Sequence, residues 1–379
     1  MSVETTYEIA VIGGGLAGLA LSIQCARAGY KVILFEREQY PFHKVCGEYI
    51  SHESWNFLQD MGVSLSDMQL PQINRVLIST PNGNFIEHPL PLGGFGISRY
   101  TLDHTLAGIA RKEGVTVRED TRVMDVVFRN NQFIIFTNKG EFEVKVAAGT
   151  FGKRSNLDVK WKRQFTKKKP NKLNHYVGVK YHIRVAHPSD LIALHNFENG
   201  YCGISQIEDN KYCLCYLTTA HNLRRNQNDI HKAEKNILMK NPFLYKIFSS
   251  AEFLYDEPVT ISRISFNKKT QVENHVLLIG DAAGMITPLC GNGMSMALHG
   301  SKLAFEQIND FLIGNINRFD LEQQYTQQWE KHFGKRLITG RILQRFFGNA
   351  TLSNILLTIV KPFPRFASWL ISLTHGQPF

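Results

Sequence analysis

One stretch late in the chain combines several glycines with a single carboxylate and almost no other charge. Residues 280–300 read GDAAGMITPLCGNGMSMALHG, and Gly280-Asp281 directly follows the apolar run Val276–Ile279. A parallel strand that ends in Gly-Asp places the carboxylate at the carboxyl edge of its sheet, where ligands bind in open α/β folds. The loop Gly291–Gly293 precedes a run of small and apolar residues typical of a helix. We therefore expect Asp281 to bind a hydroxyl-bearing chain and the loop N–H groups to bind a carbonyl edge.

A second glycine cluster lies near the start of the chain. The β-branched run Ile9–Ile12 predicts a buried strand, and Gly13, Gly15 and Gly18 follow it before an apolar helix that runs to about Ala28. In this spacing the first glycine makes a tight turn, the second admits a pyrophosphate, and the third lets helix and strand pack closely. The helix N-terminus then faces the phosphates. The pattern predicts binding of an adenine dinucleotide.

The two clusters together indicate which dinucleotide binds. A second strand is expected at Lys31–Phe35, and Glu36 follows it in position to accept hydrogen bonds from ribose hydroxyls. NAD and FAD share this pattern, but a ribityl chain and the N1–C2=O edge of a reduced flavin require the groups of the late cluster. We therefore predict FAD. The alternative for the late cluster is a plain strand–loop–helix unit with structural glycines.

Both clusters resemble the FAD-binding fingerprints of the flavoprotein family that includes p-hydroxybenzoate hydroxylase, the geranylgeranyl reductases and the flavin-dependent halogenases. AAGTFGKRS at 147–155 is similar to the short motif that closes the FAD domain of this family, and SRYTLDHTL at 98–106 contains an arginine that matches one near the pyrophosphate. The residue after EDTR matches a backbone contact to adenine. The resemblance covers about residues 1–310. The expected cofactor-binding residues are Gly13, Gly15, Leu16, Ala17, Gly18, Glu36, Arg37, Cys46, Gly47, Arg99, Val123, Ala148, Gly149, Gly280, Asp281, Pro288, Gly291, Asn292, Gly293 and Met294.

The stretch YPFHKVCGEYIS at 40–51 resembles the geranylgeranyl reductase-like branch of this family, with Pro41, Cys46 and Gly47 at the matching positions. The resemblance implies that Cys46 lies beside the isoalloxazine ring, and Cys46 is our candidate catalytic residue. A polarizable thiol there could tune the flavin or gate substrate access, whereas the alternative is a structural cysteine. Glu48 is a further candidate for the pocket.

The same branch carries a Tyr-x-Trp-x-Phe-Pro motif that shapes a prenyl-binding cavity. The nearest match keeps Tyr201 but replaces the bulky residues that follow, so we expect a differently shaped cavity. The Trp-x-Trp-x-Ile-Pro motif of the halogenases is also missing from the sequence, which disfavours halogenation. Cys213 and Cys215 share one side of an expected strand, and we interpret them as buried core cysteines rather than a redox pair.

The order of the expected elements predicts an α/β fold. A Rossmann-like FAD/NAD(P)-binding domain, with a mostly parallel sheet in three layers, is joined to an antiparallel β-sheet substrate domain and to C-terminal helices. We expect a discontinuous FAD domain at 1–75, 99–155 and 271–320, the substrate domain at 76–98 and 156–270, and the helical region at 321–379. The apolar and basic C-terminal segment could pack on the FAD domain, line an apolar pocket or lie on a membrane surface.

Composition and charge limit the binding partners and the cellular location that we expect. The 379 residues are 43% apolar and 20% charged, as in an ordinary globular protein, and the N-terminus lacks the pattern of a signal peptide, so we expect the cytoplasm, with peripheral contact at the inner membrane face as the other option. Six cysteines without zinc spacing predict no metal. The net charge is +10, and the segment Lys153–Lys172 carries nine Lys or Arg and one acid. This segment is either a solvated loop or a surface for an acidic redox protein or anionic lipid; nucleic acid is not expected.

These observations predict an FAD-dependent oxidoreductase similar to the geranylgeranyl reductases. It would pass a hydride or electrons through the flavin to an apolar, unsaturated or quinone-like small molecule. No second dinucleotide fingerprint is present, so we expect NAD(P)H to bind transiently, or an external electron carrier to act, as the reductant. One alternative is a flavin-dependent monooxygenase that hydroxylates an aromatic or polyketide substrate. Another is an electron-transfer flavoprotein adaptor that docks a redox protein.

Overall fold

The computed structural model describes residues 7–167, 174–287, 291–344, 347, 350–363, 365, 368–369 and 376–379. The first sheet has six strands in the order β17-β18-β10-β1-β2-β6, and only β17 runs antiparallel to its neighbour. All residues of the central strands are buried, which explains their continuous apolar sequence. The strands are β1 (Ile9–Ile12), β2 (Val32–Phe35), β6 (Thr116–Arg118), β10 (Val146–Gly149), β17 (Val272–Glu273) and β18 (Val276–Leu278).

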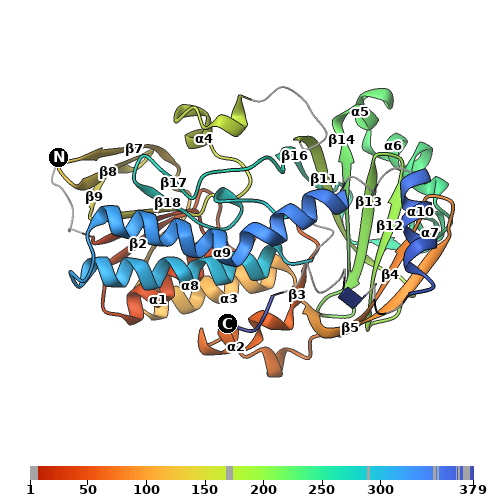
Figure 1. Ribbon diagram of the computed structural model, residues 1–379, viewed down its shortest axis with the longest axis horizontal. Helices are drawn as coiled ribbons and strands as arrows, with labels where there is room; N and C mark the ends of the chain where they lie inside the picture. Colours follow the sequence, from red (N-terminus) through yellow and green to blue (C-terminus); the bar gives the residue numbers. More distant parts are fainter. Residues whose placement is uncertain are drawn as a thin grey trace.

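Two layers cover this sheet (Figure 1). On one face lie the long helices α1 (Leu16–Arg27), α3 (Arg99–Lys112), α8 (Gly293–Leu312) and α9 (Arg318–Gln344). The other layer is a three-stranded antiparallel sheet, which shares one apolar core with the first sheet and the helices. Its strands are β7 (Val123–Arg129), β8 (Gln132–Thr137) and β9 (Gly140–Val144). Three layers are present as predicted, but the third is this small antiparallel sheet, which the sequence patterns did not reveal.

The second large sheet has the order β15-β11-β14-β13-β12-β4-β5-β3, with β16 also paired to β11. Its pairs are antiparallel as predicted, except that β4 and β12 run parallel. The strands are β3 (Tyr49–Ser51), β4 (Gln72–Ser79), β5 (Phe85–Gly96), β11 (Asn174–Arg184), β12 (Leu191–Phe197), β13 (Gly200–Gln206), β14 (Tyr212–Thr219), β15 (Glu252–Phe253) and β16 (Val259–Ser265).

Side chains alternate between the two faces of this sheet. Val179, Tyr181 and Ile183 of β11 point to an apolar core that includes Leu244 and Ile247 of α7 (Pro242–Ser250). The intervening residues of β11 face the FAD-binding half of the molecule. The remaining helices are α2 (Trp55–Asp60), α4 (Asn156–Lys160), α5 (Ala220–Arg225), α6 (Ile230–Asn236) and α10 (Ala350–Val360). Among the described residues, no helix has the length and hydropathy needed to span a bilayer.

Candidate cofactor site

The carboxyl ends of β1, β10 and β18 lie side by side, because these strands pair in parallel. A β-carbon added to Gly280, which has a φ of +63°, would lie 3.4 Å from the Cβ of Ala17 in α1. The two glycine clusters, more than 260 positions apart in sequence, are therefore in contact. Gly18 is equally constrained, since a β-carbon there would lie 2.1 Å from the carbonyl oxygen of Gly13. The tight strand-to-helix packing expected from this motif is confirmed.

Helices α1 and α8 begin at this same edge, and their first turns lack a capping side chain within the described part of the chain. By contrast, α3, α4, α5, α6 and α7 each begin with a side chain that accepts a backbone hydrogen bond, and α2 continues a 3₁₀ turn that Ser51 caps in the same way. An uncapped helix start leaves N–H groups and the positive dipole end to bind an anionic or carbonyl group. Both starts therefore fit a bound cofactor: the first its diphosphate, the second a ring carbonyl.

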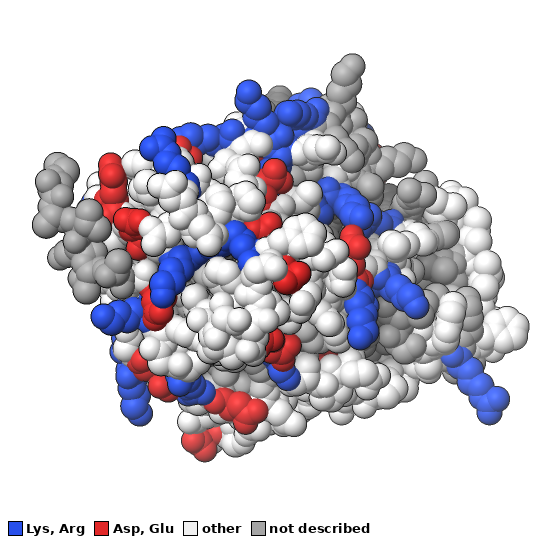
Figure 2. All heavy atoms as spheres, turned by 60° about the vertical axis from the view of Figure 1, so that its left-hand side comes forward, with Lys and Arg blue, Asp and Glu red and all other residues white. Residues whose placement is uncertain are grey.

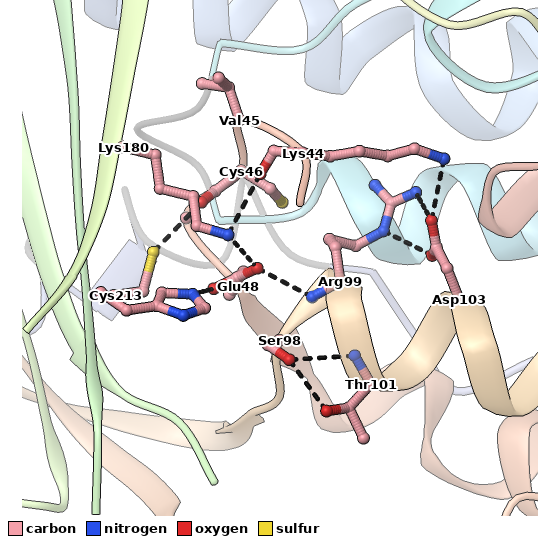
Figure 3. Close-up of polar contacts among 12 residues, drawn as sticks. Lys44, Val45, Cys46, Glu48, Ser98, Arg99, Thr101, Asp103, Lys180 and Cys213 are labelled. Carbon is pink, nitrogen blue, oxygen red and sulfur yellow. Dashed lines mark hydrogen bonds and ion pairs between the residues drawn. The ribbon is translucent and has the colours of Figure 1, made fainter. Parts of the chain in front are cut away.

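Two cations border the first turn. A β-carbon on Gly15 would lie 3.4 Å from Nη2 of Arg99 and 3.8 Å from Nζ of Lys44. Both cations bind Asp103: Arg99 Nε and Nη2 donate to its two oxygens at 2.7 Å, and Lys44 Nζ donates at 3.0 Å (Figure 3). Burial raises the pKa of the Asp103 carboxyl, but Arg99 and Lys44 more than offset it, so the pKa is lowered. The trio carries one excess positive charge beside a bare turn, which fits a diphosphate.

Glu36 lies where a ribose would bind. Its Oε2 accepts the Gly14 N–H and its Oε1 accepts the Arg37 N–H, both at 2.8 Å. These bonds fix the buried carboxylate, and each oxygen retains capacity to accept a further hydroxyl. The Thr121 N–H donates to the Glu36 carbonyl at 2.8 Å, which brings the segment before Val123 beside it. The Arg37 side chain points to solvent and pairs with Glu38, so only its backbone takes part here.

The buried side chain of Lys269 binds the backbone of the late glycine cluster at Asp281. Lys269 Nζ donates to the carbonyl oxygens of Asp281 at 2.7 Å and Lys153 at 3.3 Å. Burial lowers the pKa of Lys269 to about 8. The Asp281 residue itself stays partly exposed, as a ligand contact requires. Leu16, Ala17, Ala148, Gly149, Asn292, Gly293 and Met294 line the same edge of the sheet or the two helix starts, whereas Pro288 and Cys290 lie outside the described residues.

The loop before Glu48 is fixed by four consecutive carbonyl groups. Lys180 Nζ donates to the carbonyl of Lys44 at 3.2 Å, and Lys153 Nζ to that of Val45 at 2.9 Å. Cys213 Sγ donates to the carbonyl of Cys46 at 3.2 Å, and Ser205 Oγ to that of Gly47 at 3.3 Å. The backbone of this loop, residues 44–47, is thus set before any ligand binds. Among the described residues, nothing lies within 4 Å of a β-carbon built on Gly47, so the chain does not crowd the loop at this position.

Glu48 is fully buried at the centre of this network (Figure 3). Its Oε1 binds Lys180 Nζ at 2.5 Å and accepts the Arg99 N–H at 2.8 Å, while its Oε2 lies 2.6 Å from His182 Nε2. Burial alone would raise the pKa of this carboxyl, but Lys180 and His182 bring it down to about 2. Burial lowers and Glu48 raises the pKa of Lys180, with a net upward shift. Glu48 is therefore ionised and joins the loop to the second sheet.

The same network contains the only set of three metal-ligating groups found among the described residues: Glu48, His182 and Cys213, whose ligand atoms lie within 4.8 Å of one another. The Lys180 ammonium occupies the Glu48 carboxylate, and burial raises the pKa of the Cys213 thiol well above its usual value. Burial also raises the pKa of Cys215 to about 12. Protonated thiols of this kind suit neither metal binding nor thiol exchange.

Lys180 and His182 were not found from the sequence. They occupy alternate positions of β11 between the buried Val179, Tyr181 and Ile183, so a period-two pattern was visible. In the paired strands, Lys180 lies opposite Cys215, and His182 lies opposite Cys213. The pattern could have shown that two polar side chains share a face, but not that this face meets Glu48.

Farther along the same face, the sheet becomes apolar. On β13, Ser205 contacts the loop, Gly203 has no side chain, and Tyr201 is buried in an apolar cluster. Tyr201 also packs edge-on against Phe347, with ring centroids 6.0 Å apart. The face therefore changes from polar at residues 44–47 to apolar about 13 Å away, the length of four residues along a strand. The apolar cluster comprises Tyr176, Leu194, Tyr201, Leu217, Ile264, Phe266 and Met285.

The basic segment lies on the surface around α4 (Figures 1 and 2), where Lys and Arg side chains gather along the upper edge of the molecule. Arg163 is an exception, because it is buried, pairs with Asp158 at 2.7 Å and donates to the Ala282 carbonyl at 3.1 Å. Residues 168–172 of this segment lie outside the described residues. A role in docking a redox protein stays a prediction. The exposed cations are Arg154, Lys160, Lys162 and Lys167.

Comparison with known proteins agrees with this geometry. A family model described as an FAD binding domain matches residues 8–44. The flavin-dependent brominase Bmp2 superposes with a TM-score of 0.80 at 20% identity, covering 98% of this chain and 93% of the brominase. The chain has the p-hydroxybenzoate hydroxylase-type flavoprotein fold. The predicted fold class is therefore confirmed, and the FAD binding domain supports FAD as the cofactor of this flavoprotein.

Two relatives cover most of the flavoprotein chain at low identity. Conditioned medium factor receptor 1 of Dictyostelium discoideum is 26% identical over 412 residues, which covers 99% of this chain and 78% of the receptor. Digeranylgeranylglycerophospholipid reductase of Methanosarcina acetivorans is 23% identical over 357 residues, which covers 90% of this chain and 85% of the reductase. The names of these two relatives, a receptor and a reductase, differ in function, so the comparison does not identify a single substrate.

Proposed function

We propose that this flavoprotein is an FAD-dependent oxidoreductase similar to the geranylgeranyl reductases, acting on an apolar, unsaturated or quinone-like small molecule. The observation that carries the proposal is the gradient along the second sheet, from the fixed loop at residues 44–47 to the apolar cluster around Tyr201. A substrate with a reducible head and a long apolar tail matches both ends of this gradient. The relationship to digeranylgeranylglycerophospholipid reductases agrees with such a substrate.

The residues of the chain hold the cofactor and set its surroundings. Arg99 and Lys44 would bind the diphosphate, Glu36 the ribose, and the start of α8 the polar edge of the ring. When bound, FAD supplies the group that accepts and donates a hydride or electrons. The loop at 44–47 would place Cys46 near that group, and the apolar cluster would exclude water from an apolar tail of the substrate. In this proposal, the bound FAD would be reduced by NAD(P)H that binds transiently or by an external electron carrier.

The proposal is tested by asking what reoxidises the reduced protein without oxygen. The FAD-loaded protein is reduced with dithionite under argon and mixed with a menaquinone that carries a prenyl tail, or with the same quinone lacking the tail. We expect the flavin absorbance to return with both quinones, and at much lower concentration with the tailed one. If the reduced protein is reoxidised by added oxygen rather than by quinone, and an added aromatic substrate gains one oxygen atom in the process, the protein is instead a monooxygenase. Reoxidation only by a redox protein would identify an electron-transfer adaptor.

A further inference from the structure

Helix α10 has two apolar faces, only one of which is covered. Ser353, Leu357 and Val360 are buried, and the helix packs against β12 of the second sheet. Ile355 and Ile359 lie on the opposite face and are 51% and 52% exposed. A surface helix normally carries polar residues on its outer face. Burial in the protein therefore does not account for the exposed apolar stripe formed by Ile355 and Ile359.

Another apolar side chain is exposed just beyond the end of the helix. Phe363 lies three residues after Val360 and is 61% exposed. Two exposed cations, Lys361 and Arg365, lie in the same short segment. Apolar side chains flanked by lysine and arginine are typical of segments that lie in the interface of a bilayer.

The charge of the C-terminal region decides between a membrane and a second copy of the chain as the partner. Residues 331–379 contain no aspartate or glutamate, so two copies brought face to face would place like charges together. An anionic lipid surface attracts this region instead, since each lysine or arginine near such a surface strengthens binding. The exposed cations that follow α10 are Lys361 and Arg365, whereas Arg336 on α9 is mostly buried and pairs with Glu53.

We propose that Ile355, Ile359 and Phe363, with Lys361 and Arg365, form a docking surface for anionic membranes. At eleven residues, α10 would lie along the membrane rather than cross it. The position is suited to an apolar substrate, because Phe347, just before α10, packs on Tyr201 of the apolar cluster. The docking surface itself stands on its own residues and does not depend on the proposed reaction.

The test is flotation of the full FAD-loaded protein with vesicles of phosphatidylcholine alone or mixed with phosphatidylglycerol. We expect binding to the anionic vesicles that weakens as salt is raised. The double variant Ile355→Gln/Ile359→Gln should bind about tenfold more weakly, because two half-exposed isoleucines no longer insert. The double variant Lys361→Gln/Arg365→Gln should lose about fivefold for each charge on anionic vesicles only.

Matched controls are Phe319→Gln on α9 and Ile313→Gln at the end of α8, whose side chains are exposed at the other end of the protein. They should bind vesicles like the unchanged protein. Retained flavin absorbance shows that each variant is folded. The proposal is overturned if the unchanged protein does not float, or if the isoleucine variant floats equally well. It is also overturned if the protein is a dimer without lipid that the isoleucine variant makes monomeric, since a second copy would then cover this face.

Discussion

The ion pair between Lys180 and Glu48 allows a sharp test of the candidate site. Both side chains are fully buried, with Nζ and Oε1 2.5 Å apart. Replacing Lys180 with methionine removes the cation and keeps most of the side-chain volume. It leaves a buried carboxylate with the Arg99 N–H and His182 as partners. We expect a loss in the free energy of unfolding of about 3 to 5 kcal/mol, the usual cost of removing one partner of a buried pair.

The pKa of Glu48, which Lys180 and His182 lower against the effect of burial, determines how the stability of this network depends on pH. The shift from 4.5 to about 2 corresponds to about 3 kcal/mol at 1.36 kcal/mol per pKa unit. Because the folded pKa lies below the unfolded one, this stabilisation is complete above about pH 4.5 and is lost as the pH falls toward 2. Glu48→Gln should therefore unfold with a flatter pH dependence than the unchanged protein across this window.

The assay is urea unfolding followed by circular dichroism, with FAD in excess and flavin fluorescence as a second signal. The double variant Glu48→Gln/Lys180→Met should be more stable than the sum of the single variants predicts, by about 2 kcal/mol or more, because neither charge is left unpaired. The control is Lys268→Met, which removes an exposed pair with Glu330 and should cost less than about 1 kcal/mol. A Lys180→Met variant that resembles this control, or strictly additive effects, would refute the coupling that the geometry implies.

Three further predictions concern the cofactor half of the site. Arg99→Met and Lys44→Met should each raise the dissociation constant for FAD about 10- to 100-fold in a fluorescence titration of the apoprotein, the loss expected for a charge-assisted bond, whereas Arg111→Met should not. Between pH 8 and 10.5, Lys269 keeps its proton only in the unfolded chain, so the free energy of unfolding should rise by about 3 kcal/mol across this window. Lys269→Met should abolish this rise. Gly18→Ala should cost about 1 to 3 kcal/mol in thermal unfolding and reduce bound flavin, because its methyl group would meet the Gly13 carbonyl, whereas Gly108→Ala, with no atom within 4 Å, should be harmless.

The cofactor half could be predicted because its signals are local. The turn after β1 needs glycines at fixed spacing, and the strands around it are buried on both faces, so each is a short apolar run. The small sheet β7–β9 was missed, although Asn130 and Asn131 adopt positive φ in the turn of its first hairpin and are typical of such turns. The Asn-Asn pair between two apolar runs is therefore the sequence signal for this hairpin.

The network around Glu48 could not be predicted in the same way. Glu48 and Lys180 are 132 residues apart, and their contact depends on which strand pairs with which, and in what register. A shift of one residue in β11 would turn Lys180 toward the apolar core and Tyr181 toward the loop. Sequence patterns specify the two faces of a strand, but the packing of one sheet against another domain decides which face meets the cofactor.

This division explains how one fold can serve relatives that differ in substrate. The glycine turns, the uncapped helix starts and the Arg99–Asp103 pair would contact only the cofactor in the proposed arrangement, and they lie away from the apolar cluster of the second sheet. Residues on β11, β13 and β14 that point toward the loop can change without disturbing the apolar core on the other side of the sheet. In this chain, those positions place a buried charge network at one end and an apolar cluster at the other. Substrate choice should therefore change with substitutions around Tyr201, whereas flavin binding should change with substitutions around Arg99.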